Sequence, residues 1–499
     1  MKINRIFGAL LLAVSMVGFQ ACSDVENPVV DTGLRTGNAS KIEIYRDSVP
    51  VNDLIFSIGK GNAVLGILAD GNWTAELADS SWCKLVVHAG YGYTNKKSYT
   101  KIEVAKNEGN ERATTLTVRS GSITKNVTIT QKGIGTDPND PFMSAFTFVE
   151  KLGYGYNLGN TLESNHDITN PQVLQWFNPQ TVYDWETCWG QPVTTPEIIN
   201  AIAARGFNVI RVPVTWFPHM DADGNVETAW MNRVQEVVDM VLNAGCYCIL
   251  NVHHDASEFD ASRGDGAHWL VADVEQYPVV SAKFKKLWTQ IADRFKAYDD
   301  RLVFEAVNEI LSAKGEWGDP ADPTCYEALN KLEQDFVDVV RATGGNNEYR
   351  NLLVNPYSAG SSPAKLAGMQ LPNDKHPNHL FCSIHSYDPY WFCNDGGGIG
   401  SDDEKYFIYI FDETCKQEID DIFARVDKRF GSDFGVPYIF GEFAAGGTHV
   451  AMGERVKYAQ YMRQKFAQYN TTGLWWMGLM DRKTMEWYES DIVDALLKR

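Results

Sequence analysis

The chain has 499 residues, of which 44% are hydrophobic and 22% charged, and its formal net charge is −19. A chain of this length has room for about two or three domains with substantial cores. The acidity argues against nucleic-acid binding, because phosphate backbones are bound by basic surfaces. The composition is instead typical of a protein that acts on an uncharged partner.

The N-terminal segment, residues 1–22, is predicted to be a targeting sequence. Lys2 and Arg5 precede an apolar run of about 14 residues, which is shorter than the ~20 that span a membrane. Cys22 ends a Phe-Gln-Ala-Cys sequence that resembles a bacterial lipobox, in which the Cys is lipidated; a plain secretory signal cleaved near Ala21 is the alternative. The acidic residues directly after Cys22 resemble the surface-export signal of Bacteroidetes lipoproteins. We therefore expect an outer-membrane or cell-surface lipoprotein whose lipid anchor is its only membrane contact.

The next part of the chain is predicted to be a tether and a small β domain. Residues 23–38 are polar and rich in turn formers. Residues 39–133 contain short alternating segments broken by Gly, Asn and Ser, which predicts an immunoglobulin-like β-sandwich. The motifs around Trp73 and Trp82, with the closing run at 127–133, resemble a BACON domain. The two Trp side chains are either core residues, which we favour, or a sugar platform, and we expect the domain to be a non-catalytic spacer.

The C-terminal part is predicted to be a (β/α)8 TIM barrel. Residues 134–141 are a Pro- and Asp-containing linker, and strand and helix signals alternate over 142–499. Near-continuously apolar segments stand at 153–159, 209–214, 246–252, 301–307, 352–357, 380–386, 436–442 and 473–478. Such alternation predicts a parallel sheet covered by helices, and the number of repeats predicts a closed barrel. An open doubly wound sheet is disfavoured, because no Gly-rich phosphate loop follows the first strand.

Two glutamates are the candidate catalytic residues. Glu309 and Glu442 each follow an apolar strand segment, and in a barrel both strand ends open onto the face that carries active sites. Two carboxylates across a groove can break a glycosidic bond. A single such acid would more often be a loop residue or an ion-pair partner. The ordered pair favours catalysis, with Glu309 as general acid/base and Glu442 as nucleophile.

Other strand-end residues are candidates for tuning these acids and binding sugar. Arg211 is expected to keep the nucleophile ionised, or to form a structural ion pair, or both. His253 and Asn308 can donate hydrogen bonds to sugar hydroxyls, and Asn308 is the candidate contact for the 2-hydroxyl. His385 and Tyr387 can orient the two glutamates.

Aromatic residues at the last strand have divided roles. Trp475 and Trp476 point to opposite faces of the strand, so only one can face a sugar. We favour Trp476 for that role and expect Trp475 to pack against helices.

Metal binding and disulfides are the alternatives for the His and Cys residues. His253, His254, Asp255 and His385 could ligate a metal, but paired glutamates need none, so we expect no metal and no cofactor. The spacing of the Cys residues does not resemble a disulfide framework. Bridges between Cys382 and Cys393, or between Cys393 and Cys415, are the only candidates.

The strand-end motifs together resemble glycoside hydrolase family 5, a retaining family of clan A. The motifs are NLGNTLE, ETCWG, GFNVIRVPVTW, ILNVHHD, FEAVNE, HSYDP and IFGEF, between residues 157 and 443. The resemblance implies that Glu309 is the general acid/base and Glu442 the nucleophile, the same roles that their positions at the strand ends favour. Two departures are Ile310 after the first glutamate, where many relatives have Pro, and Met477-Gly478 after the Trp pair, which puts the sugar contacts there in doubt.

The resemblance implies a monomeric endo-β-1,4-glucanase acting on cellulose or a related plant cell-wall β-glucan. A retaining mechanism requires the two carboxyl carbons to lie ~5–5.5 Å apart. Xyloglucanase, mixed-linkage β-glucanase and β-mannanase activities stay open. A non-catalytic glycan-binding protein is the alternative from another class. Loop residues that could decide specificity are His166, Trp176, Trp185, Trp189, Trp269 and Trp391.

Overall fold

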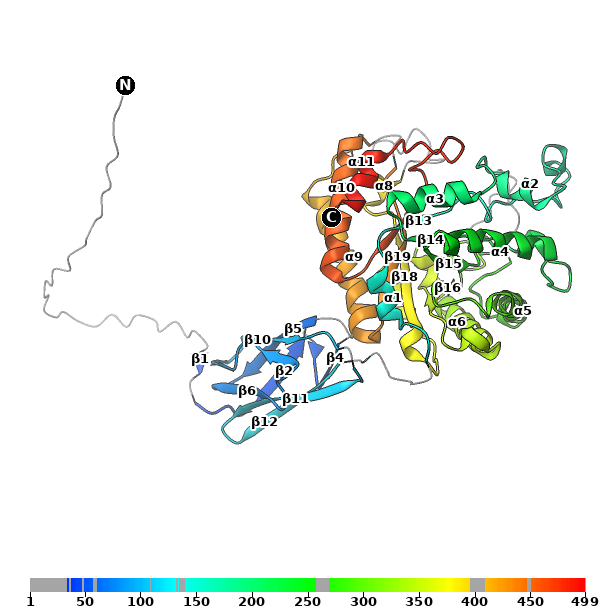
Figure 1. Ribbon diagram of the computed structural model, residues 1–499. Coiled ribbons are helices and arrows are strands. Elements are labelled where there is room, and N and C mark those ends of the chain that lie inside the picture. The colour runs from blue at the N-terminus through cyan, green and yellow to red at the C-terminus, as the bar shows by residue number, and fades with distance from the viewer. Residues whose placement is uncertain are drawn as a thin grey trace, which may run out of the picture.

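The computed structural model describes residues 34–498, apart from 36, 47–48, 57–60, 108, 132, 134–139, 257–268, 395–408 and 447–449. The targeting segment, Cys22 and most of the predicted tether and linker lie outside the described residues. Two units are seen, a β-sandwich and a helix-covered barrel (Figure 1). No helix in the described part of the chain has an apolar stretch long enough to cross a membrane.

The N-terminal unit is all-β, as predicted. One sheet has the order β3 (Val49–Pro50), β2 (Ile42–Arg46), β5 (Gly61–Ala69), β10 (Ser98–Val104), β7 (Cys83–Leu85). The second has the order β4 (Asp53–Phe56), β12 (Ile123–Gln131), β11 (Arg112–Ser120), β6 (Trp73–Leu77), β8 (Ala89–Gly90). A short pair joins β1 (Leu34–Arg35) to β9 (Gly92–Tyr93). Trp73 and Trp82 are both buried in the core between the sheets, so neither is an exposed sugar platform.

The C-terminal unit is a closed barrel of parallel strands, which confirms the predicted fold class. Its strands in order are β13 (Gly155–Asn157), β14 (Val209–Val212), β15 (Tyr247–Asn251), β16 (Leu302–Glu305), β17 (Leu352–Val354), β18 (Leu380–Ser386), β19 (Tyr438–Phe443) and β20 (Gly473–Trp476). The helix α1 (Ala145–Lys151) packs its apolar side chains against an inward-facing layer that includes Val209, Ile249 and Leu353. Because this layer fills the interior, the barrel is a packed core and not a pore.

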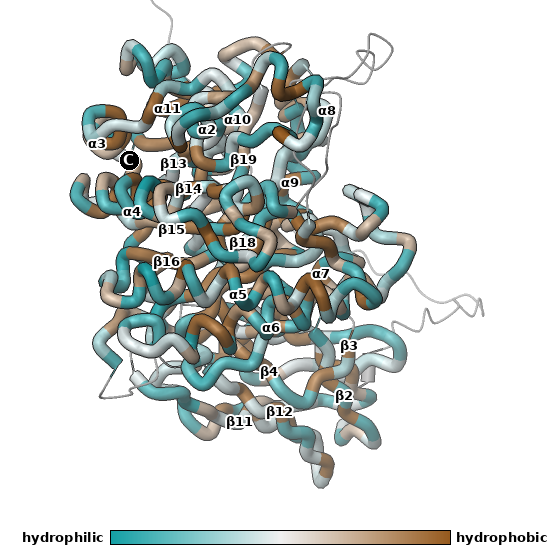
Figure 2. The backbone as a smooth tube through the Cα atoms, turned by 90° about the vertical axis from the view of Figure 1, so that its right-hand side faces the viewer, coloured by the Kyte–Doolittle hydropathy of each residue, from teal (hydrophilic) through white to brown (hydrophobic). Residues whose placement is uncertain are grey.

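Amphipathic helices cover the outside of the barrel. The longer ones are α3 (Pro196–Arg205), α4 (Thr228–Asn243), α5 (Tyr277–Phe295), α6 (Thr324–Ala342), α9 (Glu413–Val426), α10 (Met452–Tyr469) and α11 (Ser490–Leu497). Short ones are α2 (Val182–Thr187), α7 (Pro363–Gly368) and α8 (Tyr390–Cys393). Single 3₁₀ turns are η1 (Val173–Gln175), η2 (Phe217–His219), η4 (Gly345–Glu348), η5 (Tyr357–Ala359) and η6 (Pro377–His379), and α9 continues as the π-helix η8 (Asp427–Phe434). Hydrophobic and hydrophilic residues alternate along α5 and α6, as expected for helices with one buried side (Figure 2).

The sandwich touches the barrel near α1 and η8. Arg46 Nη2 donates to Ser432 Oγ at 3.1 Å, and Lys106 pairs with Glu150 of α1 at 2.6 Å. This end of the barrel is the one that α1 fills, away from the strand ends that carry the polar motifs. The sandwich therefore leaves those strand ends uncovered.

The two candidate disulfide bridges, Cys382–Cys393 and Cys393–Cys415, are not formed. Every cysteine among the described residues is a free thiol. Cys382, Cys393 and Cys415 are buried in the apolar core between barrel and helices, where each packs as a small hydrophobic side chain.

Candidate active site

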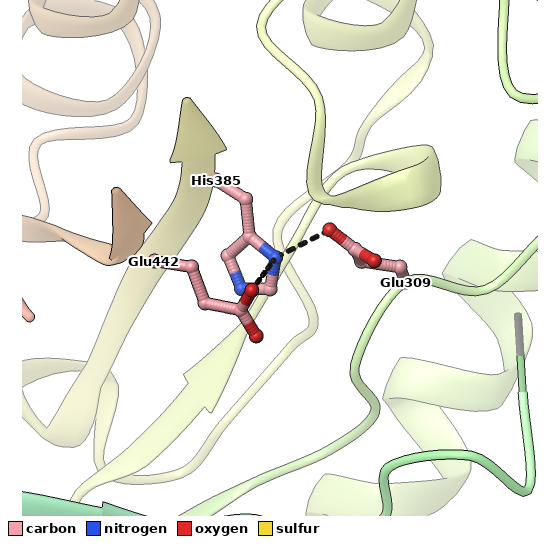
Figure 3. Close-up of side chains that lie close together, drawn as sticks. All are labelled: Glu309, His385 and Glu442. Atoms are coloured by element: carbon pink, nitrogen blue, oxygen red, sulfur yellow. Dashed lines mark hydrogen bonds and ion pairs between the residues drawn. The ribbon is translucent and has the colours of Figure 1, made fainter. Parts of the chain in front are cut away.

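The two candidate glutamates meet at the C-terminal ends of two barrel strands, β16 and β19, which are separated by β17 and β18. Glu309 lies in the loop after β16, while Glu442 lies in β19 in register with His385 of β18. The His385 ring lies between the two carboxylates (Figure 3). Its Nδ1 is 2.7 Å from Glu309 Oε1 and 3.7 Å from Glu442 Oε2. One oxygen of each glutamate and the His385 nitrogen all lie within 4.8 Å of one another.

Glu442 is buried and accepts hydrogen bonds at both oxygens. Arg211 Nη1 donates to its Oε1 at 2.6 Å, and the Tyr387 hydroxyl donates to its Oε2 at 2.7 Å. Burial by itself would raise the pKa of Glu442. The charges of His385 and Arg211, with the two hydrogen bonds, outweigh burial and lower the pKa below its ordinary value. The carboxylate is therefore kept ionised, as a nucleophile requires.

Arg211 is the centre of a buried network that also includes residues not singled out from the sequence. Its Nε donates to Glu305 Oε2 at 2.7 Å, and its Nη1 donates to Asn157 Oδ1 at 3.0 Å. Its Nη2 donates to Asn308 Oδ1 at 2.8 Å. Both roles foreseen for Arg211, a structural ion pair and a contact with Glu442, thus coexist. The sequence did hold a signal for Glu305, because it is an acid inside a strand expected to be buried on both faces. A buried charge needs a partner of opposite charge, which here is Arg211.

His253 is neutral and faces the last strand. It is fully buried, and burial lowers its pKa well below the ordinary value. Asn251 Nδ2 lies 3.0 Å from His253 Nδ1, and with the amide donating, the neutral ring carries its proton on Nε2. The ring stacks on Trp476, with centroids 5.7 Å apart and planes 8° apart. His253 can therefore donate one hydrogen bond from a fixed orientation.

Both residues of the Trp pair line the cleft at the strand ends, but they differ in burial. Trp475 is buried and packs edge-on against Phe443 and Tyr458. Trp476 is partly exposed and lines a cleft of about 1350 Å³ together with Glu309, His385 and Tyr387.

The cleft has aromatic walls that sequence reasoning missed. Trp317, Tyr390 and Tyr488 line it and are 44%, 49% and 53% exposed. They stand in the connections after three different strands, Tyr390 at the start of α8, and nothing in their local sequence marks them as neighbours. None of the six loop residues expected to decide specificity lines this cleft. Trp269, for example, donates from Nε1 to Asp255 at 2.6 Å and so supports its own loop.

The four-residue metal alternative does not form. Among the described residues, the only group of three or more His, Cys, Asp or Glu side chains close enough to share an ion is Glu309, His385 and Glu442. Asp255 turns away and accepts from Trp216 N at 2.7 Å. Within the remaining group, Arg211 already supplies the positive charge at Glu442. These three side chains and Arg211 therefore form an ion-pair network.

A TIM barrel with two carboxylates facing each other at its strand ends is the architecture of a glycoside-cleaving enzyme, and comparison with known proteins agrees. A family model described as Cellulase (glycosyl hydrolase family 5) matches residues 169–478. A second, BACON, described as a putative N-terminal binding domain, matches residues 71–132. Because the first match covers more than half of the chain, the chain belongs to glycosyl hydrolase family 5.

Individual relatives support this assignment. Endoglucanase A of Clostridium longisporum is 32% identical over 374 residues, covering 71% of this chain and 66% of that protein, just under two thirds of its length. A mutant of a family 5 enzyme from Prevotella bryantii B14, solved with a xyloglucan tetradecasaccharide, is 36% identical, with TM-score 0.62 over 72% of this chain and 99% of that one. A Bacteroides ovatus family 5 xyloglucanase, solved with a heptasaccharide, is 25% identical, with TM-score 0.61 over 92% of this chain and 99% of that one.

Proposed function

We propose that the protein is a retaining endo-β-1,4-glucanase, with Glu309 as general acid/base and Glu442 as nucleophile. The observation that carries the proposal is the closeness of the two carboxylates, whose oxygens lie within 4.8 Å of each other. Retaining enzymes hold their two carboxyl groups ~5–5.5 Å apart, whereas inverting enzymes need ~6.5–9.5 Å to admit a water molecule, and oxygens this close favour the shorter separation between the groups. The different surroundings of the two acids support the division of roles.

The first step forms a covalent intermediate. Glu309 gives its proton to the glycosidic oxygen as the bond to the anomeric carbon breaks, and a Glu442 oxygen bonds to that carbon from the opposite face of the sugar. Arg211 and Tyr387 hold the attacking carboxylate in a single orientation. In the second step, Glu309 takes a proton from water, the water oxygen bonds to the anomeric carbon, and Glu442 leaves as a carboxylate.

Neighbouring residues support the charge changes and bind the sugar. Burial lowers the pKa of His385, but the charge of Glu442 and the hydrogen bond and charge of Glu309 outweigh it, so the pKa stands above its ordinary value. Because His385 tends to stay protonated, its positive charge stabilises the negative charge on whichever of the two glutamates is ionised during the reaction. Asn308 has its oxygen committed to Arg211, which leaves its NH₂ group to donate to a sugar hydroxyl. Trp476 offers a ring face for the sugar.

The substrate panel is the direct test of the proposed activity. We expect the purified protein to release reducing sugars from carboxymethyl cellulose, mixed-linkage β-glucan and xyloglucan, and to release far less from β-mannan. Endo action predicts an early fall in viscosity, because internal cuts shorten the polymer before much sugar is released. Xyloglucan is the second candidate substrate, since the Bacteroides ovatus xyloglucanase aligns over both the sandwich and the barrel. Binding of a glucan with no hydrolysis of any panel member would contradict the proposal and favour a glycan-binding protein.

Tyr387→Phe is expected to shift the pH profile. The variant loses the hydrogen bond to Glu442 Oε2, which helps to lower the pKa of that carboxyl. Without it the pKa rises, so Glu442 becomes protonated and inactive at a higher pH. We expect the acidic limb of kcat/KM to move to higher pH, and kcat/KM at neutral pH to fall by about tenfold, the typical effect of a bond to a charged group. Tyr458→Phe is the matched control, because that buried tyrosine packs on Trp475 and does not touch Glu442. An unmoved acidic limb in Tyr387→Phe would contradict the assignment.

A further inference from the structure

The main chain that carries Glu309 is held by the loop that follows the next strand, β17. Asn355 Nδ2 donates to the carbonyl oxygens of Val307 at 2.9 Å and Asn308 at 2.6 Å. These are the two residues directly before Glu309. One amide group therefore uses both of its N–H bonds to fix the backbone from which the acid/base side chain projects.

The same loop also holds the residues after Glu309. Ser358 N donates to Ile310 O at 3.0 Å. The Tyr357 hydroxyl accepts from Ser312 N and donates to Glu316 O, both at 2.7 Å. Ser358 adopts a φ of 50°, a left-handed backbone conformation that residues other than Gly rarely adopt. A strained backbone of this kind persists where surrounding contacts over-determine it, and such sites cluster at active sites.

Asn355 is in turn held by a carboxyl group outside the cleft. Its backbone N donates to Glu333 Oε1 at 2.7 Å, and Glu333 belongs to α6 on the outer side of the barrel. Both residues are fully buried. Glu333 Oε2 and Asn355 Oδ1 each lack a hydrogen-bond partner. Both atoms are acceptors when Glu333 is ionised, whereas a protonated Glu333 has an O–H group that can donate. Burial raises the pKa of Glu333 well above its ordinary value, which favours the uncharged form with an O–H donor.

We propose that Glu333 and Asn355 form a buried clamp that positions Glu309 for proton transfer. The proposal rests on the acid/base role assigned to Glu309 above. Asn355 is the positioning residue, because its amide binds the backbone next to the acid. Glu333 acts through Asn355: it binds the backbone N–H and offers its own O–H to the amide oxygen, which keeps the NH₂ group turned toward Val307 and Asn308. A reversed amide would place its oxygen against those two carbonyl oxygens, which is repulsive.

The experiment uses the leaving group as its readout. Asn355→Asp keeps the shape of the side chain but removes the NH₂ donors, and Asn355→Ala removes the group. Hydrolysis of a cello-oligosaccharide needs a well-placed proton from Glu309, whereas an aryl β-cellobioside with a dinitrophenolate leaving group does not. We expect kcat/KM for the oligosaccharide to fall by roughly 10- to 100-fold, since a misplacement of about 1 Å can cost that much, and kcat/KM for the aryl glycoside to stay within about threefold.

Asn347→Ala is the matched control. Asn347 is also buried, and its Nδ2 donates to Ala292 O at 2.7 Å and to Thr343 Oγ1 at 2.9 Å, in the connection between α6 and β17. This variant should lower the unfolding temperature and change both substrates equally. A fall of equal size for both substrates in the Asn355 variants would show a merely structural role and overturn the proposal, as would no fall at all. If wild type hydrolyses neither substrate, it is the proposed function that fails.

Glu333 provides a second pair of variants should the Asn355 variants fail to fold. Glu333→Gln keeps an acceptor for Asn355 N and a donor for Asn355 Oδ1, so it should behave like wild type with both substrates. Glu333→Leu has neither and should reproduce the loss that is selective for the poor leaving group. If Glu333→Gln lost as much kcat/KM for the oligosaccharide as Glu333→Leu, again selectively, the role of Glu333 as an uncharged donor to Asn355 would be overturned.

Discussion

Glu442→Gln is expected to abolish hydrolysis of β-glucan, with kcat reduced by about 10⁴- to 10⁶-fold, the scale seen when a nucleophile is removed from an enzyme. The amide cannot form the glycosyl ester, because its oxygen carries no negative charge to attack the anomeric carbon. The fold should survive. Arg211 keeps its ion pair with Glu305 and its bond to Asn157, so no buried cation is left unpaired. Reducing-sugar release on the best substrate of the panel, with thermal unfolding alongside, measures both effects.

The matched control is Glu186→Gln. Glu186 is buried and forms a bidentate pair with Arg233, at 2.8 and 3.0 Å, between α2 and α4. Its change should lower the unfolding temperature without a comparable loss of kcat. Retention of more than about 1% of wild-type kcat in Glu442→Gln would place the nucleophile elsewhere, because a removed nucleophile costs far more than that.

Glu309→Gln is expected to separate substrates by their leaving groups. Removal of a general acid costs about 10²- to 10⁴-fold where the leaving oxygen needs a proton. We expect a loss of that size in kcat/KM for a cello-oligosaccharide, and only a small loss in kcat/KM for a dinitrophenyl β-cellobioside. With the aryl substrate the second step becomes slow, because no base activates water, so a burst of phenolate should precede slow turnover.

Azide tests the second step of the same variant. It is a small anionic nucleophile that needs no base, so it should speed turnover of the aryl glycoside in Glu309→Gln and yield a β-glycosyl azide, whose configuration reports retention. Wild type should form none of this product in quantity. An equal loss of kcat/KM for both substrates, with no response to azide, would remove Glu309 from the acid/base role.

Much of the site was readable from the chain because the signals are local. Each barrel strand is a near-continuously apolar run, and most candidate residues lie at or directly after the end of such a run, as Glu442 and His385 do. Closure of a parallel barrel then brings all strand ends to one face without any further information. The two glutamates, with Arg211 and Tyr387, are found together for this reason.

The residues that were missed depend on contacts between loops. Trp317, Tyr390 and Tyr488 become walls of one cleft only because three separate loops fold over the same strand ends. The bond from Asn355 to the backbone before Glu309 likewise joins positions 47 and 48 residues apart, through an amide in an ordinary-looking Asn-Pro turn. Whether the two candidate disulfides form was undecided for the related reason that sequence spacing does not give the distance or direction between two side chains.

The sequence by itself determined the fold class, the family and the two carboxylates, because period-two and period-3.6 patterns and strand-end motifs are properties of short segments. Only the tertiary structure decided which groups surround those carboxylates: His385 between them, Arg211 shared between Glu442 and Glu305, and Glu333 behind Asn355. Hydrogen bonds between side chains form within about 3 Å, and positions known only to the nearest strand end leave that distance undetermined.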